Sequence, residues 1–328
     1  MISVIIPVRN GGETLRACLE AVFSSHIPEG EYEVLVVDDA STDDTGTIVR
    51  EFPCRYMRRE EQAGPAVARN DGAREATGDV LLFIDADMVL SADALMGVRE
   101  TFVNPEIVAC QGVAEKEPFN EGFVPTYRAL CNAYFTEKMA EHDFHITFHT
   151  RCGAIRRSVF EELGGFDTSF SDAIVEDEEF GRRVNQRYRV RVRRAIRGRH
   201  REPGLVASLS KYFSRSYGSA RLIVSHDFIF DKSELTPVHS VGAVAAAAAP
   251  LAVIARSSLA TITLLSVYGA SRAEVFAFIK RERGAPFLLA TIPLDYLLTA
   301  TAGVGGVLGA VAALPGAITC SKSRSDPS

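Results

Sequence analysis

Short runs of apolar residues, rich in valine and isoleucine, recur along the N-terminal part of the chain. Runs of this kind are typical of strands that are buried on both faces of a parallel sheet. Segments with apolar residues at helical spacing separate them, and this alternation predicts an α/β fold with an open, doubly wound, mostly parallel, Rossmann-like sheet. The strands that we expect are ISVIIPV, YEVLVVDD, CRYMR, DVLLFIDAD and EIVACQGVA, and the helices are residues 13–24, 43–52, 66–76 and 92–102.

Two of the expected strands end in pairs of aspartates, Asp38 with Asp39 and Asp85 with Asp87. Ligands of open α/β sheets bind beyond the carboxyl ends of the strands, so we expect both pairs to face one crevice. Two carboxylates about 4 Å apart repel each other by about 4 kcal/mol at an effective dielectric constant near 20, unless they share a cation. Mg²⁺ or Mn²⁺ would suit such a site. Aspartates are also common in ordinary turns, so the pairs alone leave both interpretations open.

Further motifs follow one another along the chain. They are IIPVRN at 5–10, VVDDASTDDT at 36–45, QAGPAVARNDGAREATGD at 62–79, FIDAD at 83–87, AIRRSVFEELGGFDTSF at 154–170 and VEDEEFGRR at 175–183. Each motif is modest by itself, but the ordered series resembles the family 2 glycosyltransferases, the large inverting group with the GT-A fold. The resemblance covers about residues 1 to 200. It implies that the doubly wound sheet is of the GT-A type.

The resemblance implies a site for a nucleotide-sugar donor at the loops that follow the first two strands. Arg69 matches an arginine that lies near the base or the phosphates. The residues that match the positions holding the base and the ribose are Pro7, Val8, Arg9, Asn10 and Asp39.

The resemblance also implies a metal site and a catalytic base. Asp85, Ala86 and Asp87 match the DXD motif, in which the second aspartate ligates the metal on the donor diphosphate. His200 lies where some members supply a further metal ligand. The candidate catalytic residues are Asp177, which matches the base, and its neighbour Glu176.

Physical reasoning supports these roles independently. A divalent metal stabilises a departing diphosphate better than neutral hydrogen bonds do. A carboxylate that takes the proton of the attacking hydroxyl typically accelerates such a step by about 10²–10⁴-fold. Asp177 begins an expected helix, EDEEFGRRVNQ, whose dipole favours the ionised carboxylate. The alternative is that the acidic run only caps this helix.

The C-terminal part of the chain has a different chemistry. Residues 238–328 carry seven Lys and Arg against four Asp and Glu, a net charge of +3. Because the whole chain has a net charge of −6, residues 1–237 have a net charge of −9. Arg256 is the only charge in 241–271, and 296–321 contains none. About twenty helical residues cross the hydrocarbon layer, so the second segment is long enough to span it. Its Gly305 and Gly309 form a GxxxG motif, which favours close helix packing.

Between these segments, SRAEVFAFIKRERG is amphipathic and basic, as is typical of a helix at a cytosolic membrane interface. If it lies there, the segment 241–271 is a re-entrant hairpin. The alternative is a buried helical subdomain. We expect another amphipathic helix at LVASLSKYFSRSYGSARLIV. The expected division is a glycosyltransferase domain at 1–230 and a helical membrane-associated tail at 231–328.

Two groups of basic residues have less specific interpretations. One interpretation is a zinc site formed by His142, His145 and His149. For His149, a hydrogen bond to the acceptor substrate is the better prediction. Arginines alternate with apolar residues between 187 and 201, which indicates a strand with one basic face. That face either is solvated or contacts an anion.

The resemblance implies inversion at the anomeric carbon. Together with the observations above, it predicts a metal-dependent hexosyltransferase that uses a nucleotide-diphosphate sugar. The acceptor that we expect is a lipid or lipid-linked glycan, with the catalytic domain on the cytoplasmic side of the membrane. Nucleic acid is not an expected partner, because the domain is acidic and carries no recognition motif. The alternatives are a sugar-phosphate nucleotidyltransferase, whose Arg–Lys signature the loop PVRNGGETLRA lacks, and a catalytically inactive nucleotide-sugar-binding membrane scaffold.

Overall fold

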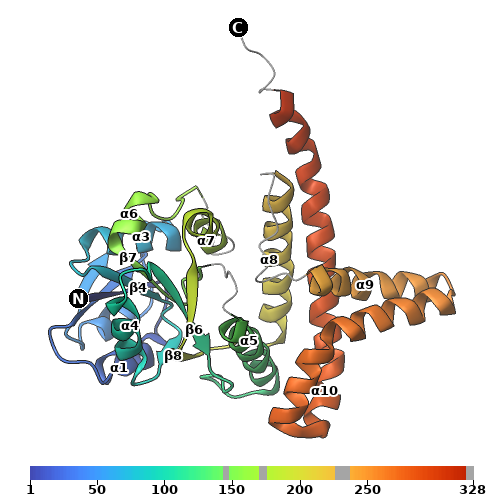
Figure 1. Ribbon diagram of the computed structural model, residues 1–328, viewed down its shortest axis with the longest axis horizontal. Coiled ribbons are helices and arrows are strands. Elements are labelled where there is room, and N and C mark those ends of the chain that lie inside the picture. The colour runs from blue at the N-terminus through green and yellow to red at the C-terminus, as the bar shows by residue number, and fades with distance from the viewer. Residues whose placement is uncertain (143–147, 170–175, 226–236, 323–328) are drawn as a thin grey trace. The chain divides into compact units, whose positions relative to one another are not determined.

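A computed structural model of the chain describes residues 1–142, 148–169, 176–225 and 237–322 (Figure 1). The chain divides into two compact units, Met1–Glu202 and Pro203–Ser328. The boundary therefore lies earlier than the expected one at residue 230. The reason is that α8 (Leu205–Ser225) packs against α10 (Ser258–Lys322) of the second unit.

The described residues of the first unit form an eight-stranded sheet in the order β3-β2-β1-β4-β7-β6-β8-β5. The strands β3, β2, β1 and β4 are parallel, as are β6 and β8, whereas β7 and β5 run antiparallel to their neighbours. This confirms the mostly parallel α/β sheet. The strands are β1 (Ile2–Val8), β2 (Tyr32–Asp38), β3 (Arg55–Arg58), β4 (Val80–Ile84), β5 (Met88–Leu90), β6 (Ala109–Ala114), β7 (Cys152–Arg156) and β8 (Val190–His200).

Helices cover both faces of this sheet. Because successive side chains of a strand point to opposite faces, Val4 and Ile6 of β1 enter one apolar cluster and Ile5 enters the other. The first cluster includes α1, α2 and α4, and the second includes α3, α6 and α7. The helices are α1 (Leu15–Phe23), α2 (Thr45–Val49), α3 (Pro65–Glu75), α4 (Ala94–Val103), α5 (Phe123–His142), α6 (Arg157–Glu162) and α7 (Glu176–Arg187).

The burial of β4 ends where its aspartates begin. All residues of β4 from Val80 to Ile84 are buried, and Asp85 is the first residue after the strand. The strand is central in the sheet, between β1 and β7, so it needs apolar side chains on both faces. Asp85 and Asp87 therefore lie at the carboxyl end of a central strand, as predicted.

In the second unit, α9 (Pro237–Ile254) is followed by α10 (Ser258–Lys322), which bends at Gly284 with φ 83° and ψ 174°. Between the two helices, Arg256 has a left-handed φ of 56°. The chain turns back there, and the two helices lie so close that a Cβ atom on Gly242 of α9 would overlap the side chain of Ser271 of α10. The apolar segment 241–271 is therefore a helical hairpin.

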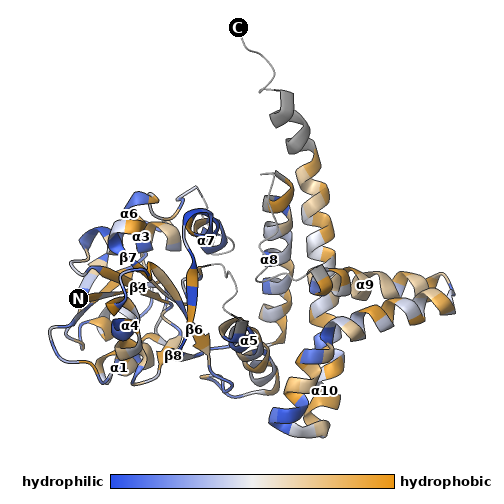
Figure 2. Cartoon of the chain, in the orientation of Figure 1, coloured by the Kyte–Doolittle hydropathy of each residue, from blue (hydrophilic) through white to orange (hydrophobic). Residues whose placement is uncertain are grey.

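The arms of α10 on either side of Gly284 are joined by a buried ion pair. Arg272 Nη2 lies 2.6 Å from Asp295 Oδ2, and Tyr268 Oη donates to Asp295 Oδ1 at 2.7 Å. By length and composition, Ser258–Leu314 of α10 is apolar enough to cross a membrane, with a mean hydropathy of 1.9 in its most apolar window. Figure 2 shows hydrophilic residues at the bend of α10 and hydrophobic ones along its arms.

The GxxxG motif packs against α8, which confirms the predicted close helix contact. A Cβ atom on Gly305 would lie 2.5 Å from the carbonyl oxygen of Phe213, and one on Gly309 would overlap the carbonyl oxygen of Tyr217. Gly306 has no atom within 4 Å of its Cβ position. Neighbouring glycines of one helix therefore face very different surroundings.

We expect Gly309→Ala to lower the stability of the second unit by about 1–3 kcal/mol, because the added methyl group forces the two backbones apart. Gly306→Ala is the matched control. It adds the same methyl group in open space and improves helix propensity, so it should leave the Tm unchanged or raise it. Thermal unfolding of the full chain in detergent, followed by circular dichroism, measures both. Equal effects of the two variants would contradict the packing described here.

Candidate active site

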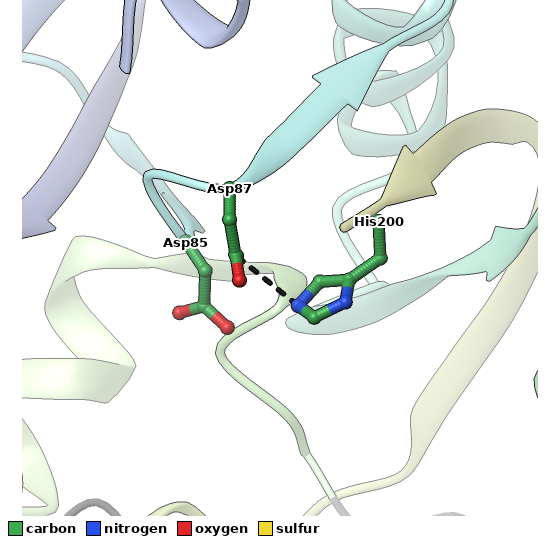
Figure 3. Close-up of side chains that lie close together, drawn as sticks. All are labelled: Asp85, Asp87 and His200. Atoms are coloured by element: carbon green, nitrogen blue, oxygen red, sulfur yellow. Dashed lines mark ion pairs between the residues drawn. The ribbon is translucent and has the colours of Figure 1, made fainter. Parts of the chain in front are cut away.

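Two aspartates and a histidine converge at the carboxyl end of β4 (Figure 3). Antiparallel pairing of β5 with β8 places Met88 opposite His200, and this register sets the imidazole beside Asp87. His200 Nε2 lies 3.1 Å from Asp87 Oδ1. One ligand atom from each of Asp85, Asp87 and His200 lies within 4.8 Å of the others. The three predicted metal-site residues are thus brought together.

Arg69 connects this group to α7. Its side chain is 4% exposed; Nη1 donates to Glu176 Oε1 at 2.8 Å and Nη2 donates to Asp85 Oδ1 at 3.0 Å. Burial disfavours the charge of the guanidinium, but Asp85, Glu176 and Asp177 outweigh this effect and raise the pKa of Arg69. The buried guanidinium of Arg69 therefore joins the carboxyl end of β4 to the N-terminus of α7.

Glu176 and Asp177 begin α7 and differ in their surroundings. Glu176 is 3% exposed, and burial, reinforced by the charge of Asp177, raises its pKa although Arg69 opposes the shift. The Asp177 side chain is partly open, with 14% exposed, and its Oδ2 lies 3.3 Å from His149 Nδ1. Of the two, Asp177 is the carboxylate that a substrate can reach.

The predicted histidine group is only partly placed. His149 lies beside Asp177, which the sequence did not indicate. His145 and the side chain of His142 lie outside the described residues.

The loops after β1 and β2 are tied to each other. The residues Pro7 and Val8 end β1, and Val8 accepts a hydrogen bond from the backbone of Asp39 at 2.8 Å. Arg9 and Asn10 are exposed, and Asn10 adopts a left-handed φ of 54°. Its Oδ1 accepts from the backbone N–H of Thr42 at 2.9 Å. The predicted donor residues therefore lie together in two interlocked loops.

The two aspartates that end β2 take different directions. Asp39 accepts hydrogen bonds from the backbones of Ala63 and Gly64, both at 2.8 Å, and so fixes the segment that leads into α3. Asp38 is fully buried and bonds Tyr56 Oη at 2.6 Å. The expectation that both pairs face one crevice is wrong for Asp38, because adjacent side chains of a strand point to opposite faces.

A cavity of about 450 Å³ adjoins Asp39. Arg59 lies in its wall, 3.5 Å from Asp39 Oδ1, and pairs with Asp71. The residues that line it are Val37, Met57, Arg58, Arg59, Glu60, Glu61 and Asp71.

Much of the basic face of β8 is engaged within the first unit. Arg194 and Arg197 pair with Glu137 of α5, and Arg201 pairs with Glu13 at 2.6 Å. The strand itself is confirmed. At these three positions the arginines are satisfied by protein carboxylates, which favours the solvated-face interpretation over an anion site.

Comparison with known proteins identifies the first unit. Residues 3–164 match the model of the family described as "Glycosyl transferase family 2". This part of the chain belongs to glycosyl transferase family 2. The family 2 region contains Arg69, Asp85 and Asp87, whereas Asp177 and His200 follow it in the same unit.

Individual relatives agree with this assignment. The chain is 44% identical to glycosyltransferase AglE of Haloferax volcanii over 171 residues, which are 50% of this chain and 55% of AglE. It is 31% identical to the probable glycosyltransferase YdaM of Bacillus subtilis over 205 residues, covering 58% of this chain and 48% of YdaM. The chain thus spans about half the length of these curated relatives.

Among solved structures, the mannosyltransferase PcManGT of Pyrobaculum calidifontis, determined with GDP-Man and Mn²⁺, is similar over 95% of this chain and 86% of its own. The TM-score is 0.59 at 20% sequence identity, a likeness that shows the fold. The first unit of the chain has the GT-A fold, as the resemblance of its motifs implied.

We expect Arg69→Lys to destabilise the first unit by about 2–3 kcal/mol, because an ammonium group cannot reach Glu176 and Asp85 together and leaves a buried carboxylate short of a partner. Arg74→Lys on the same helix is the control. Arg74 is 70% exposed and pairs with Asp71, so its replacement should change stability by less than about 0.5 kcal/mol. Urea unfolding compares the two. Similar losses would show that Arg69 is not the link between β4 and α7.

Proposed function

We propose that the chain is an inverting, metal-dependent hexosyltransferase that moves a sugar from a nucleotide-diphosphate sugar to a hydroxyl acceptor. The observation that carries this proposal is the arrangement around Arg69. Asp85 lies on one side of its guanidinium, next to Asp87 and His200, and Glu176 with Asp177 lies on the other. We propose that a diphosphate-bound cation and the catalytic base would lie on the two sides of this guanidinium.

The residues at the end of β4 fit a divalent cation. Two carboxylates about one-third exposed and one imidazole offer the oxygen and nitrogen ligands that Mn²⁺ accepts, and the oxygens also suit Mg²⁺. We propose Asp87 and His200 as protein ligands, with Asp85 beside them. When bound, the metal neutralises the charge that develops on the departing diphosphate. The remaining coordination positions would be filled by donor phosphates and water.

The donor would lie over the loops after β1 and β2. We propose that Pro7, Val8, Arg9, Asn10 and Asp39 form the nucleoside end of the site, and that Asp85 and Ala86 form the sugar-phosphate end. Arg69 is already bound to two carboxylates, so we propose that it orients Asp85 and Glu176 for the donor instead of holding the base. Family 2 membership supports a donor of this class.

Asp177 would be the catalytic base. It lies at the first turn of the twelve-residue helix α7, where the positive end of the helix dipole favours an ionised carboxylate. The acceptor hydroxyl would give its proton to Asp177 and attack the anomeric carbon from the face opposite the diphosphate. That direction of attack inverts the anomeric configuration. Glu176 would fix the start of α7 through its contact with Arg69, and so position Asp177.

The second unit would associate with the membrane and supply the acceptor from there. Large apolar side chains are widely exposed on it, and the hairpin turn alone carries six. A basic cluster that suits anionic lipid headgroups, formed by Lys280, Arg281 and Arg283, lies beside the Gly284 bend. We propose a lipid or lipid-linked glycan acceptor, with the catalytic unit in the cytoplasm. The six residues at the turn are Leu251, Val253, Ile254, Leu259, Ile262 and Leu265.

Two substitutions should separate donor binding from chemistry. In a thermal-shift screen of UDP-, GDP- and dTDP-sugars with Mn²⁺, we expect one nucleotide class to raise the Tm of the wild type by a few degrees. Asp87→Ala should abolish this shift. Asp177→Asn should retain it, while the rate of donor turnover, measured as release of nucleoside diphosphate, falls by about 10²–10⁴-fold.

The two variants control for each other because each removes one carboxylate from the same site. No shift with any donor would reject the proposed donor class. An unchanged turnover rate in Asp177→Asn would reject Asp177 as the base. Metal-dependent donor binding by the wild type without any turnover would favour the catalytically inactive scaffold.

Membrane association is tested with a pair of variants matched for exposure. Leu259 in the second unit and Val103 in the first are both 79% exposed. We expect Leu259→Glu to weaken flotation of the full chain with phosphatidylglycerol-containing vesicles by about tenfold or more, because a charged side chain in hydrocarbon costs about 2.5–3.5 kcal/mol. Val103→Glu should have no effect. A wild-type chain that stays apart from vesicles after detergent removal would overturn the proposal.

A further inference from the structure

We infer that Glu202 is a positioning residue that holds the imidazole of His200 with its Nε2 directed at the metal site. The inference deepens the proposed function and rests on it. The sequence did not single out Glu202, which follows the last strand of the first unit and occurs in no motif.

The two ring nitrogens of His200 face two different carboxylates. Nε2 lies 3.1 Å from Asp87 Oδ1, on the side of the partly exposed aspartates. Nδ1 is buried, has no hydrogen-bond partner among the described residues, and lies 3.6 Å from Glu202 Oε1. Glu202 is therefore the nearest acceptor to the nitrogen that points away from the metal site.

Glu202 is itself held rigidly, with only 2% of its surface exposed. Two side chains of α5 bind its carboxylate: Arg128 Nε donates to Oε2 at 2.8 Å and Asn132 Nδ2 donates to Oε1 at 2.6 Å. Asn120 fixes the backbone, because it accepts from the Glu202 N–H at 2.9 Å and donates to the carbonyl oxygen at 3.0 Å. Burial alone would raise the pKa of Glu202, but the charges of Arg151, His200 and Arg128 lower it.

The chemistry explains why a buried carboxylate belongs there. A neutral imidazole carries one proton, and only its bare nitrogen can bind a metal. A carboxylate behind the ring accepts the proton on Nδ1, leaves Nε2 bare and makes it more basic. The present separation of 3.6 Å is slightly longer than a hydrogen bond, so a ring movement of about half an ångström would close it.

The chain offers a matched control at another carboxylate that joins α5 and β8. Glu137 of α5 pairs with Arg194 of β8 at 2.8 Å, and among the described residues it has no ion pair with His200. Glu202→Gln and Glu137→Gln thus each remove one negative charge from an α5 contact. Only the first removes it from the imidazole.

Titration of the full chain with Mn²⁺ in a calorimeter tests the inference. We expect Glu202→Gln to weaken Mn²⁺ binding by about 10–100-fold and Glu137→Gln to leave it within about twofold. If Glu202→Gln binds Mn²⁺ as tightly as the wild type, the inference is overturned, but the proposed metal site is not. Equal losses in both variants would show a general structural role of the α5 contacts and would also overturn it. A wild type that binds no Mn²⁺ would reject the proposed metal dependence, and the inference with it.

Discussion

The site of the first unit depends on one buried cation, the guanidinium of Arg69. Asp85 and Glu176 come from segments far apart in the sequence, and without a cation between them their carboxylates would repel each other in a poorly hydrated place. Arg69 replaces that repulsion by two charge-assisted hydrogen bonds, and its planar fork fixes the direction of both. Asp85 is thereby held beside Asp87 and His200, where the proposed second cation would bind. The acidic residues would then lie between two positive charges, the guanidinium of Arg69 and the metal ion proposed on the donor diphosphate.

The alternation of strands and helices could be predicted from the sequence because β1, β2 and β4 are apolar on both faces, as interior strands of a sheet covered by helices require. Two strands could not be predicted. β5 has three residues and directly follows the aspartates, so no period is visible. β7 contains a glycine and ends in an arginine, and it is a strand because β4 and β6 pair with it on both sides. Neighbouring strands, and not its own propensity, decide its structure.

The site was predictable where it depends on motifs and unpredictable where it depends on burial. The order of the motifs indicated Asp85, Asp87 and His200, and β5–β8 pairing brings them together. The motifs could not show that Asp38 turns into the core, because that depends on the face of the strand on which it ends. Glu202 carried no signal at all. Its partners on α5 lie about seventy residues away in sequence, and only the folded chain places them around the carboxylate.

The second unit exposes many more large apolar side chains than the first. In the first, most of them lie in two buried clusters, and charges such as Arg69 and Glu176 are buried as pairs. In the second, Arg272 and Asp295 also form a buried pair, but leucines and valines are exposed along the helices. An arginine within an apolar segment costs less free energy when a carboxylate pairs with it, and here the pair also joins the two arms of α10. Arg256 lies at the turn between α9 and α10. In α9 and α10, Arg272 and Asp295 are thus paired inside and Lys280, Arg281 and Arg283 gather near the Gly284 bend, while many large apolar side chains are exposed. Water does not favour such a surface but hydrocarbon does, and this is the physical basis for the lipid or lipid-linked acceptor proposed above.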